Sequence, residues 1–192
     1  MSIPMISTEW KTQRLTVNDS VLPDLPELDQ ILMACSYIEE WSGWRHEHPE
    51  SQFDKSMRPL MMDGELPPNG SKEFFRLQSI RLSEAERIIG FLAIYHGFPT
   101  TNIAWILYLY IHPDCQGKGY GQEFVRELSE QLRRLGFTGM RLVVDVKNWP
   151  AMRFWVQEGF DKIIEMVGDK VISEETFAHL IPRNRLRHLK KS

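Results

Sequence analysis

Three consecutive segments between Asn102 and Val146 constrain the fold of this chain more than any other part of the sequence. Residues Asn102 to His112 are apolar almost throughout, as is typical of a central strand buried on both faces. Gly119 to Leu135 then repeats apolar residues at helical spacing, and Met140 to Val146 is again β-prone. A strand, a helix and a strand in succession predict two neighbouring parallel strands joined by a crossover helix.

Patterns elsewhere predict more elements on the same sheet. From Glu27 to about Trp44, apolar residues recur at a spacing that places them on one face of a helix. The polar stretch from Ser83 to Glu86 separates two strands that should pair antiparallel. The remaining predicted elements are strands at Arg14–Val17, Phe74–Arg81, Arg87–Tyr95, Phe160–Val167 and Thr176–Ile181, and a helix at Pro150–Glu158.

The segment from Arg45 to Lys72 breaks every regular period, because prolines and glycines interrupt it. One turn of helix is the only regular structure expected there. Such a long loop is uncommon inside a compact domain and is often functional. It is therefore either a lid over a functional site or a solvated surface insertion, and the sequence leaves both open.

Charge and cysteine content exclude several classes of function. The chain has 192 residues and a formal net charge of −3, whereas a general nucleic-acid binder needs a basic excess. Its longest apolar run, Ile103 to Ile111, is far short of the roughly 20 residues that span a membrane. Cys35 and Cys115 are too few for a disulfide framework, which favours the cytoplasm. No metal site is expected, because His46 and His48 have no further ligands nearby.

The hexapeptide from Gln116 to Gly121 lies between the buried strand and the amphipathic helix. Its closely spaced glycines allow a tight turn, so that backbone N–H groups at the helix start can point at a pyrophosphate. A nucleotide P-loop would need Ser or Thr after Lys118, where this chain has Gly119. A dinucleotide-binding fingerprint would follow the strand directly, whereas further residues separate this hexapeptide's glycines from the strand. By itself the hexapeptide could also be an ordinary glycine-rich turn.

Two motifs together resemble the GNAT superfamily of N-acetyltransferases. The phosphate-loop motif of that family is Gln or Arg, two residues, Gly, one residue, then Gly or Ala. A second motif begins with Asn and Ala and ends with Gly-Phe. The matching residues are Gln116, Gly119 and Gly121 for the first motif, and Asn148, Ala151, Phe154, Gly159 and Phe160 for the second. Thr12, Arg14 and Leu15 also match the Thr-x-Arg-Leu opening of some members, which does not identify a substrate.

The resemblance implies one GNAT-like domain over residues 1–192 with an α/β (α+β) fold. Its sheet would be mixed, mostly antiparallel, six- to seven-stranded and splayed centrally, with helices on both faces. The cofactor-binding core would span about 103–160 and the acceptor side about 18–73. Acetyl-CoA would lie in the split as cosubstrate, with no metal, and its pantetheine amides would add to the open backbone near Leu109 to Ile111 as an extra strand does. Residues implied to contact it are Leu109, Tyr110, Ile111, Gln116, Gly117, Lys118, Gly119, Tyr120, Gly121, Gln122, Asn148, Ala151, Phe154 and Trp155.

The implied reaction moves an acetyl group to a primary amine of a small molecule or protein, by direct attack in a ternary complex. Many members protonate the departing sulfur with a Tyr where this chain has Trp155, and an indole N–H is no acid near neutral pH. Tyr108 or Tyr110 is the hypothesised acid, with Tyr110 the catalytic candidate. Tyr110 alternates with Leu109 and Ile111 along the strand and should therefore face the opposite side of the sheet. Glu39, Glu40 or a water chain is the hypothesised base.

Two other functions stay open at this stage. Other members place a Glu base early in the strand before the phosphate loop, where the stretch from Ala104 to Leu107 offers none. The missing Tyr and Glu also suit a non-catalytic acyl-CoA-binding or regulatory module, and a longer acyl chain is a third option. The expected partners are acetyl-CoA and an unidentified amine acceptor, with neither nucleic acid nor membrane. The sequence does not determine the assembly, for which a homodimer is one option.

Overall fold

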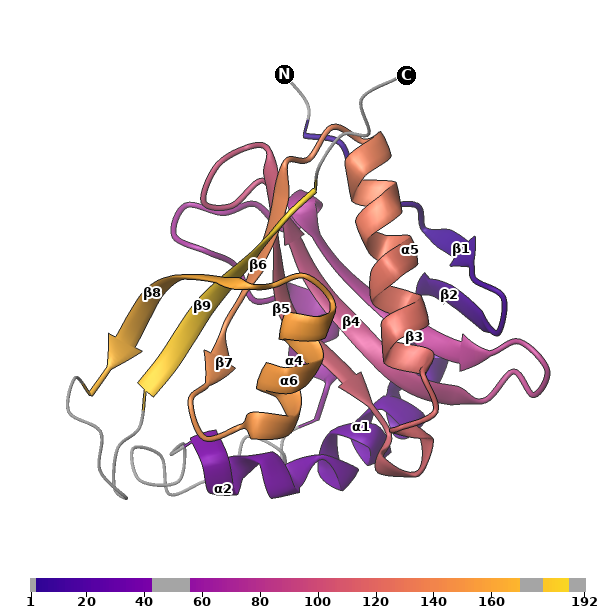
Figure 1. Cartoon of the computed structure of the whole chain (residues 1–192). Helices are drawn as coiled ribbons and strands as arrows, with labels where there is room; N and C mark the ends of the chain where they lie inside the picture. The colour runs from indigo at the N-terminus through magenta and orange to yellow at the C-terminus, as the bar shows by residue number, and fades with distance from the viewer. Residues whose placement is uncertain (1–2, 43–55, 170–177, 187–192) are drawn as a thin grey trace.

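The structure is a computed structural model that describes residues 3–42, 56–169 and 178–186. Its centre is the predicted strand, helix and strand, namely β5 (Ile103–Ile111), α5 (Tyr120–Arg134) and β6 (Gly139–Leu142) (Figure 1). β5 and β6 pair in parallel from Ile103 opposite Gly139 to Ile106 opposite Leu142. The crossover predicted from the sequence is confirmed.

Within the described residues the sheet has nine strands in the order β1-β2-β3-β4-β5-β6-β9-β7, and β8 pairs with β9. Every pair other than β5–β6 is antiparallel, so the mixed, mostly antiparallel sheet is confirmed. The number exceeds the six to seven expected, because the short β1 shows no clear pattern and because the segment from Met140 to Val146 is divided at Val143. The other strands are β1 (Glu9–Lys11), β2 (Leu15–Asp19), β3 (Phe75–Leu82), β4 (Ile88–His96), β7 (Val144–Asp145), β8 (Lys162–Gly168) and β9 (Ala178–Arg185).

The single helix predicted from Glu27 to Trp44 is wrong. The structure has α1 (Leu25–Ala34), a 3-10 turn (Ser36–Ile38) and then α2 (Glu39–Ser42). The break falls at Cys35, which is fully buried and points its thiol at the Ile111 carbonyl oxygen, 3.9 Å away. Burial raises the pKa of Cys35 to about 12, so its thiol stays neutral. Docking of this residue on the end of β5 bends the chain there.

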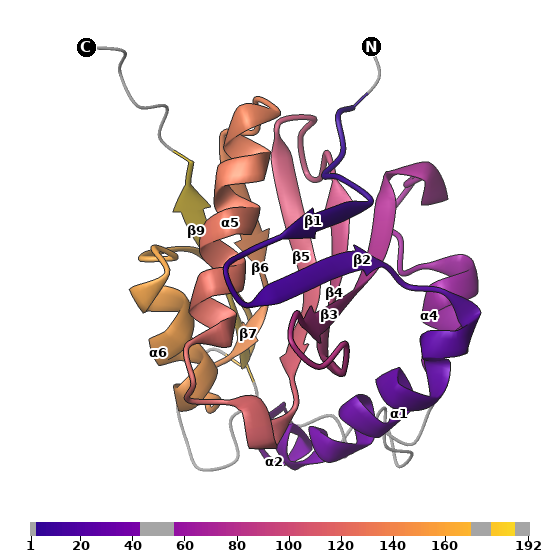
Figure 2. The same ribbon diagram turned by 90° about the vertical axis from the view of Figure 1, so that its right-hand side faces the viewer.

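Helices cover both faces of the sheet, as predicted (Figure 2). α5 and α6 (Trp149–Gln157) pack on one face, where Leu128 and Trp155 join the larger cluster of buried side chains. α1 and α4 (Arg58–Asp63) pack on the other, through residues such as Leu28 and Leu60. α4 is the turn of helix expected in the loop from Arg45 to Lys72. Residues 45–55 of that loop lie outside the described part.

The sheet opens where β5 and β6 part. Their pairing ends at Ile106 and Leu142, and Val143 is 47% exposed. β7 pairs instead with β9, so the second half of β5 has β4 on one side and a gap on the other. This is the central splay that the resemblance implied.

Candidate functional site

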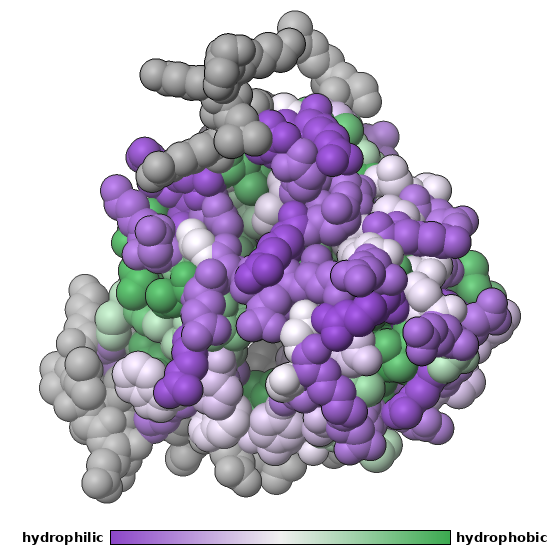
Figure 3. Space-filling model, turned by 45° about the vertical axis from the view of Figure 1, so that its right-hand side comes forward, coloured by the Kyte–Doolittle hydropathy of each residue, from purple (hydrophilic) through white to green (hydrophobic). Residues whose placement is uncertain are grey.

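A cavity of about 530 Å³ lies between the parted strands, the start of α5 and the side of α6. The space-filling view shows a hollow below its centre, between these elements (Figure 3). All but one of the residues predicted to contact a cofactor line this cavity, and the exception is the exposed Lys118. The lining residues among them are Leu109, Tyr110, Ile111, Gln116, Gly117, Gly119, Tyr120, Gly121, Gln122, Asn148, Ala151, Phe154 and Trp155.

Two glycines shape the loop before α5. Gly117 and Gly119 have φ of 72° and 83°, a left-handed conformation that favours glycine. Within the described residues, the backbone N–H groups of 117–122 have no hydrogen-bond acceptor, because the first bond of α5 runs from Glu123 N–H to Gly119 O. Unpaired amides at the start of a helix form a site for an anion, which the helix dipole reinforces.

Gln116 fastens the end of β5. Its Nε2 donates to the Ile111 carbonyl oxygen at 2.8 Å and to the Tyr37 hydroxyl oxygen at 3.0 Å. Of the backbone groups predicted to be open between Leu109 and Ile111, the Ile111 carbonyl is therefore already bound. Gln116 joins the phosphate loop, the strand and the segment after α1, which makes it a structural link as well as a cavity residue.

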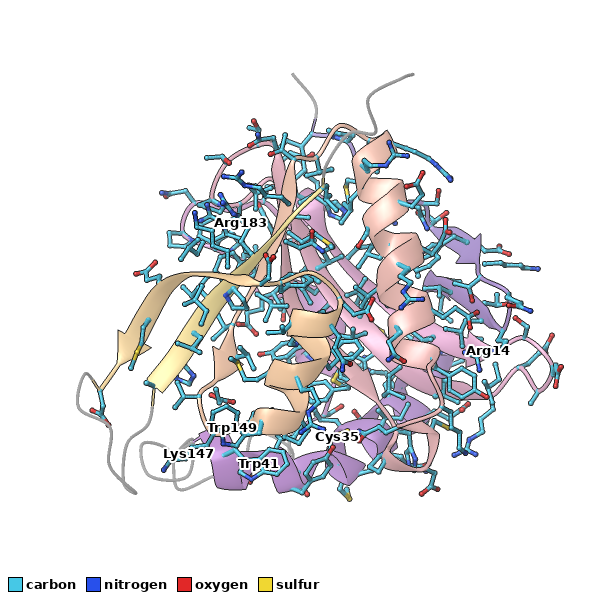
Figure 4. All side chains as sticks on the ribbon, in the orientation of Figure 1. Arg14, Cys35, Trp41, Lys147, Trp149 and Arg183 are labelled. Atoms are coloured by element: carbon cyan, nitrogen blue, oxygen red, sulfur yellow. The ribbon has the colours of Figure 1, made fainter. Side chains whose placement is uncertain are left out.

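The Thr-x-Arg-Leu element clamps the phosphate loop from outside the cavity. Arg14 lies beside the start of α5 (Figure 4), where its Nε donates to Glu123 Oε2 at 2.6 Å and its Nη1 to the Lys118 carbonyl oxygen at 3.0 Å. Its guanidinium also stands 4.5 Å from the centre of the Tyr120 ring. Thr12 Oγ1 donates to the other Glu123 oxygen at 2.5 Å. Loop and helix start are thus tied to the chain segment before β2.

Glu123 is the anion at the centre of this clamp. Burial alone would raise the pKa of Glu123, but hydrogen bonds from Thr12 and Arg14 outweigh burial and hold that pKa below its usual range. A depressed carboxyl pKa stabilises the folded state at higher pH, and this contribution is lost as the pH falls through the depressed value. The clamp is therefore intact at neutral pH.

Arg14→Gln is expected to raise the dissociation constant for CoA about tenfold, because the loop loses both a hydrogen bond and a cation–π contact. Titration calorimetry measures this change. Arg126→Gln is the matched control, since Arg126 lies near Arg14 and pairs with Glu158 at 3.4 Å without contacting the loop. An equal loss of CoA affinity in both variants would show that the loss comes from the change in net charge and not from the contacts of Arg14 with the loop.

α6 closes the cavity on the side away from β5. Asn148 caps this helix, with Oδ1 accepting from Ala151 N–H at 3.1 Å. A Cβ at Gly121 would stand 3.2 Å from the Phe154 ring, so glycine lets α5 pack closely on α6. Trp155 is only 8% exposed and packs edge-on against Phe154 and Phe160, each 4.9 Å between ring centres. Trp155 thus belongs to the core and also borders the cavity.

Tyr110 lies on the α1 side of the sheet, opposite Leu109 and Ile111, as strand alternation predicted. Its ring packs 5.2 Å from Phe91 and stacks 6.1 Å from Tyr108. Burial, with Cys35 and Asp145 nearby, raises the pKa of Tyr110 above its ordinary value. The phenol therefore carries its proton throughout the neutral range.

The structure adds a carboxylate that the sequence analysis missed. Asp145 on β7 lines the cavity, and its Oδ1 lies 2.6 Å from His179 Nδ1 on β9. Glu39, a predicted base, is only 4% exposed and does not line the cavity, and the side chain of Glu40 lies outside the described part. One feature of the sequence could have pointed to Asp145: it is the only acidic residue in the segment from Met140 to Val146.

Other candidates are not assembled into sites. Cys115 lines the cavity, and a cysteine nucleophile there would need a histidine base. The Nδ1 atom of His112, however, accepts a hydrogen bond from the Asp114 N–H in the turn after β5. His46 and His48 lie outside the described residues, within which no three His, Cys, Asp or Glu side chains are grouped to hold a metal ion. Nor does that part of the chain contain a helix that is both long and apolar enough to cross a membrane.

Comparisons with known proteins bear on this arrangement. The Acetyltransferase (GNAT) family model matches residues 28–160. Among solved structures, a probable GNAT-family acetyltransferase from Chromobacterium violaceum is similar at 12% identity and a TM-score of 0.74, covering 97% of this chain and 90% of that one. No curated protein matches.

Two other solved structures carry the same fold and are named for different acceptors. The ribosomal-protein-S18-alanine N-acetyltransferase from Escherichia coli is 15% identical, with a TM-score of 0.60 and coverage of 92% of this chain and 97% of that one. A spermidine N-acetyltransferase chimera from Vibrio cholerae and hSSAT is 17% identical, with a TM-score of 0.64 and coverage of 91% and 96%. The family match extends from α1 to the Gly-Phe pair after α6 and so covers well over half of the chain. The chain therefore belongs to the GNAT family of acetyltransferases.

Proposed function

We propose that the chain is an acetyl-CoA-dependent N-acetyltransferase that acts on a primary amine. The observation that carries the proposal is the run of unpaired amides at 117–122, which opens into the 530 Å³ cavity between the parted strands. Such amides suit a diphosphate. The proposed path of the pantetheine arm follows the open edge of β5 towards Asn148, as an added strand would. A cytoplasmic location and a single domain over residues 1–192 remain predictions.

The proposed chemistry needs a proton acceptor. An alkylamine with a pKa of about 10.4 is almost wholly protonated at neutral pH, so a base must remove its proton before attack. The nitrogen then bonds to the thioester carbonyl carbon, the carbon–sulfur bond breaks, and the CoA thiolate leaves and takes up a proton. We assign the base role to Asp145, which borders the cavity where the strands part and is oriented by His179.

The proton donor to the thiolate is proposed to be Tyr110, because Trp155 cannot supply one. The raised pKa of Tyr110 makes its hydroxyl a weak acid. We therefore expect its contribution to the rate to lie at or below the low end of the range that is typical of general acid catalysis. Tyr110→Phe keeps the ring contact with Phe91 and is expected to lower kcat about tenfold, with KM for acetyl-CoA within about twofold. An unchanged kcat would remove Tyr110 from the mechanism.

Binding and turnover are tested separately. Titration calorimetry of the whole chain with CoA and acetyl-CoA should show one saturable site, and its absence would end the proposal. Acceptor-dependent release of free CoA thiol then tests catalysis across polyamines, amino acids and short peptides. Binding without release would favour the alternative, a non-catalytic acyl-CoA-binding module, which the core position of Trp155 also suits.

A further inference from the structure

A second cavity, of about 340 Å³, lies on the α1 and α4 side of the sheet. Its walls come from α1, α4, the turn after α4, β4 and β5. Tyr108 and Tyr110 line both this cavity and the larger one. These two rings therefore border both spaces, on the half of β5 that β6 leaves uncovered.

The charges around the two cavities have one sign. Within the described residues, the charged side chains that line them are all acidic, namely Asp63 and Glu65 in the second cavity and Asp145 in the first. Arg14 lies at the phosphate loop, outside both sets of lining residues. The positive charge that would attract a polyanionic cofactor thus lies at the phosphate loop. The second cavity instead presents negative charge to its occupant.

Glu65 is held in a defined position. The Tyr108 hydroxyl donates to Glu65 Oε2 at 2.5 Å. Burial and the adjacent Glu65 carboxylate raise the pKa of Tyr108 above its ordinary value, so its hydroxyl remains a donor. One donor leaves the carboxylate with free lone pairs that a ligand N–H can use.

The rest of the lining is aromatic and apolar. The rings of Tyr108 and Tyr110 stack at an angle of 21°, and Phe91 packs beside them. Met57 and Leu60 complete the wall on the α4 side. Aromatic faces attract cations, and apolar side chains bind a hydrocarbon body.

We propose that the second cavity binds the acetyl acceptor, and that this acceptor is a small organic cation with an apolar body and no carboxylate. The inference rests on the proposed N-acetyltransferase function and adds the substrate class. Glu65 is the specificity-determining residue: its carboxylate accepts hydrogen bonds from the ligand ammonium in the binding complex, and the rings of Tyr108 and Tyr110 face the hydrocarbon part. For transfer the amine leaves Glu65 and passes these rings to reach Asp145 in the first cavity. An acceptor with a carboxylate beside the amine would be repelled by Asp63 and Glu65.

The test compares phenethylamine with phenylalanine, which differ only in the carboxylate. Each is titrated calorimetrically into the whole chain saturated with CoA, so that the reading does not depend on turnover. Phenethylamine is expected to bind at least tenfold more tightly than phenylalanine. Glu65→Gln, which keeps the shape and the bond from Tyr108, should weaken phenethylamine binding about tenfold. Glu73→Gln is the matched control, because Glu73 is exposed and does not line the cavity.

Equal affinity for the two compounds, no saturation with phenethylamine, or equal losses in Glu65→Gln and Glu73→Gln would each overturn the inference. Failure of the proposed function can be distinguished from failure of this inference. If the proposed function is wrong, a titration of CoA without amine shows no binding. In that event the amine titrations into the chain alone still report on the second cavity.

Discussion

Gly119→Ala is expected to raise the dissociation constant for CoA by about tenfold to hundredfold while the chain stays folded. Gly119 has φ of 83°, and a non-glycine residue held there costs about 1–3 kcal/mol. A Cβ would also stand 3.3 Å from Arg14 Nη2. The loop relieves the strain by rotating its peptides, and the amides must then be turned back before a diphosphate binds. Since about 1.4 kcal/mol is a tenfold change in affinity, calorimetric titration resolves the loss.

Gly136→Ala is the matched control for this experiment. Gly136 follows the end of α5 with φ of 89°, and a Cβ there meets no atom within 4 Å. Its melting temperature should fall at least as much as that of Gly119→Ala, because alanine at Gly136 meets backbone strain of the same kind. CoA affinity should stay at the wild-type value. If both variants lose affinity equally, general destabilisation explains the effect and the amides at 117–122 are not the binding site.

Asp145→Asn is expected to lower kcat about a hundredfold at neutral pH, with KM for acetyl-CoA little changed. Asparagine has nearly the shape of aspartate but cannot accept the proton of the attacking ammonium, and positioned bases contribute about 10²–10⁴-fold. Thiol release with a responsive amine measures kcat across pH. The defect should shrink as the pH approaches the pKa of the amine, about 10, because solvent then deprotonates the acceptor.

Asp161→Asn is the control for Asp145→Asn. Asp161 follows Phe160, is exposed, and does not line the cavity, so removal of its charge should leave kcat unchanged. An unchanged kcat for Asp145→Asn, or a defect that stays constant with pH, would place the base elsewhere.

Features that depend on neighbours in sequence were predictable. The glycines between Gln116 and Gly121 predicted a backbone that only glycine adopts easily, and both Gly117 and Gly119 have positive φ. Strand alternation placed Tyr110 on the face opposite Leu109. The order of strand, helix and strand predicted the parallel pair at the centre of the sheet.

The helix from Glu27 to Trp44 shows where such patterns fail. Its apolar spacing continues through Cys35, but the structure ends α1 there because Cys35 docks against the end of β5. That contact joins residues 76 positions apart, and no helical period contains it. Tertiary packing thus overrode the local preference.

The sequence by itself determined two parallel strands joined by a crossover helix, with a glycine loop at the start of that helix, because helix and strand periods and glycine conformations are local properties. Only the tertiary structure decided which charged groups meet. Arg14 reaches Glu123 across 109 positions and Tyr108 reaches Glu65 across 43, while Asp145 meets His179 because β9 pairs with β7. These pairs depend on the order of strands in the sheet, and the sequence around one partner carries no information about the position of the other.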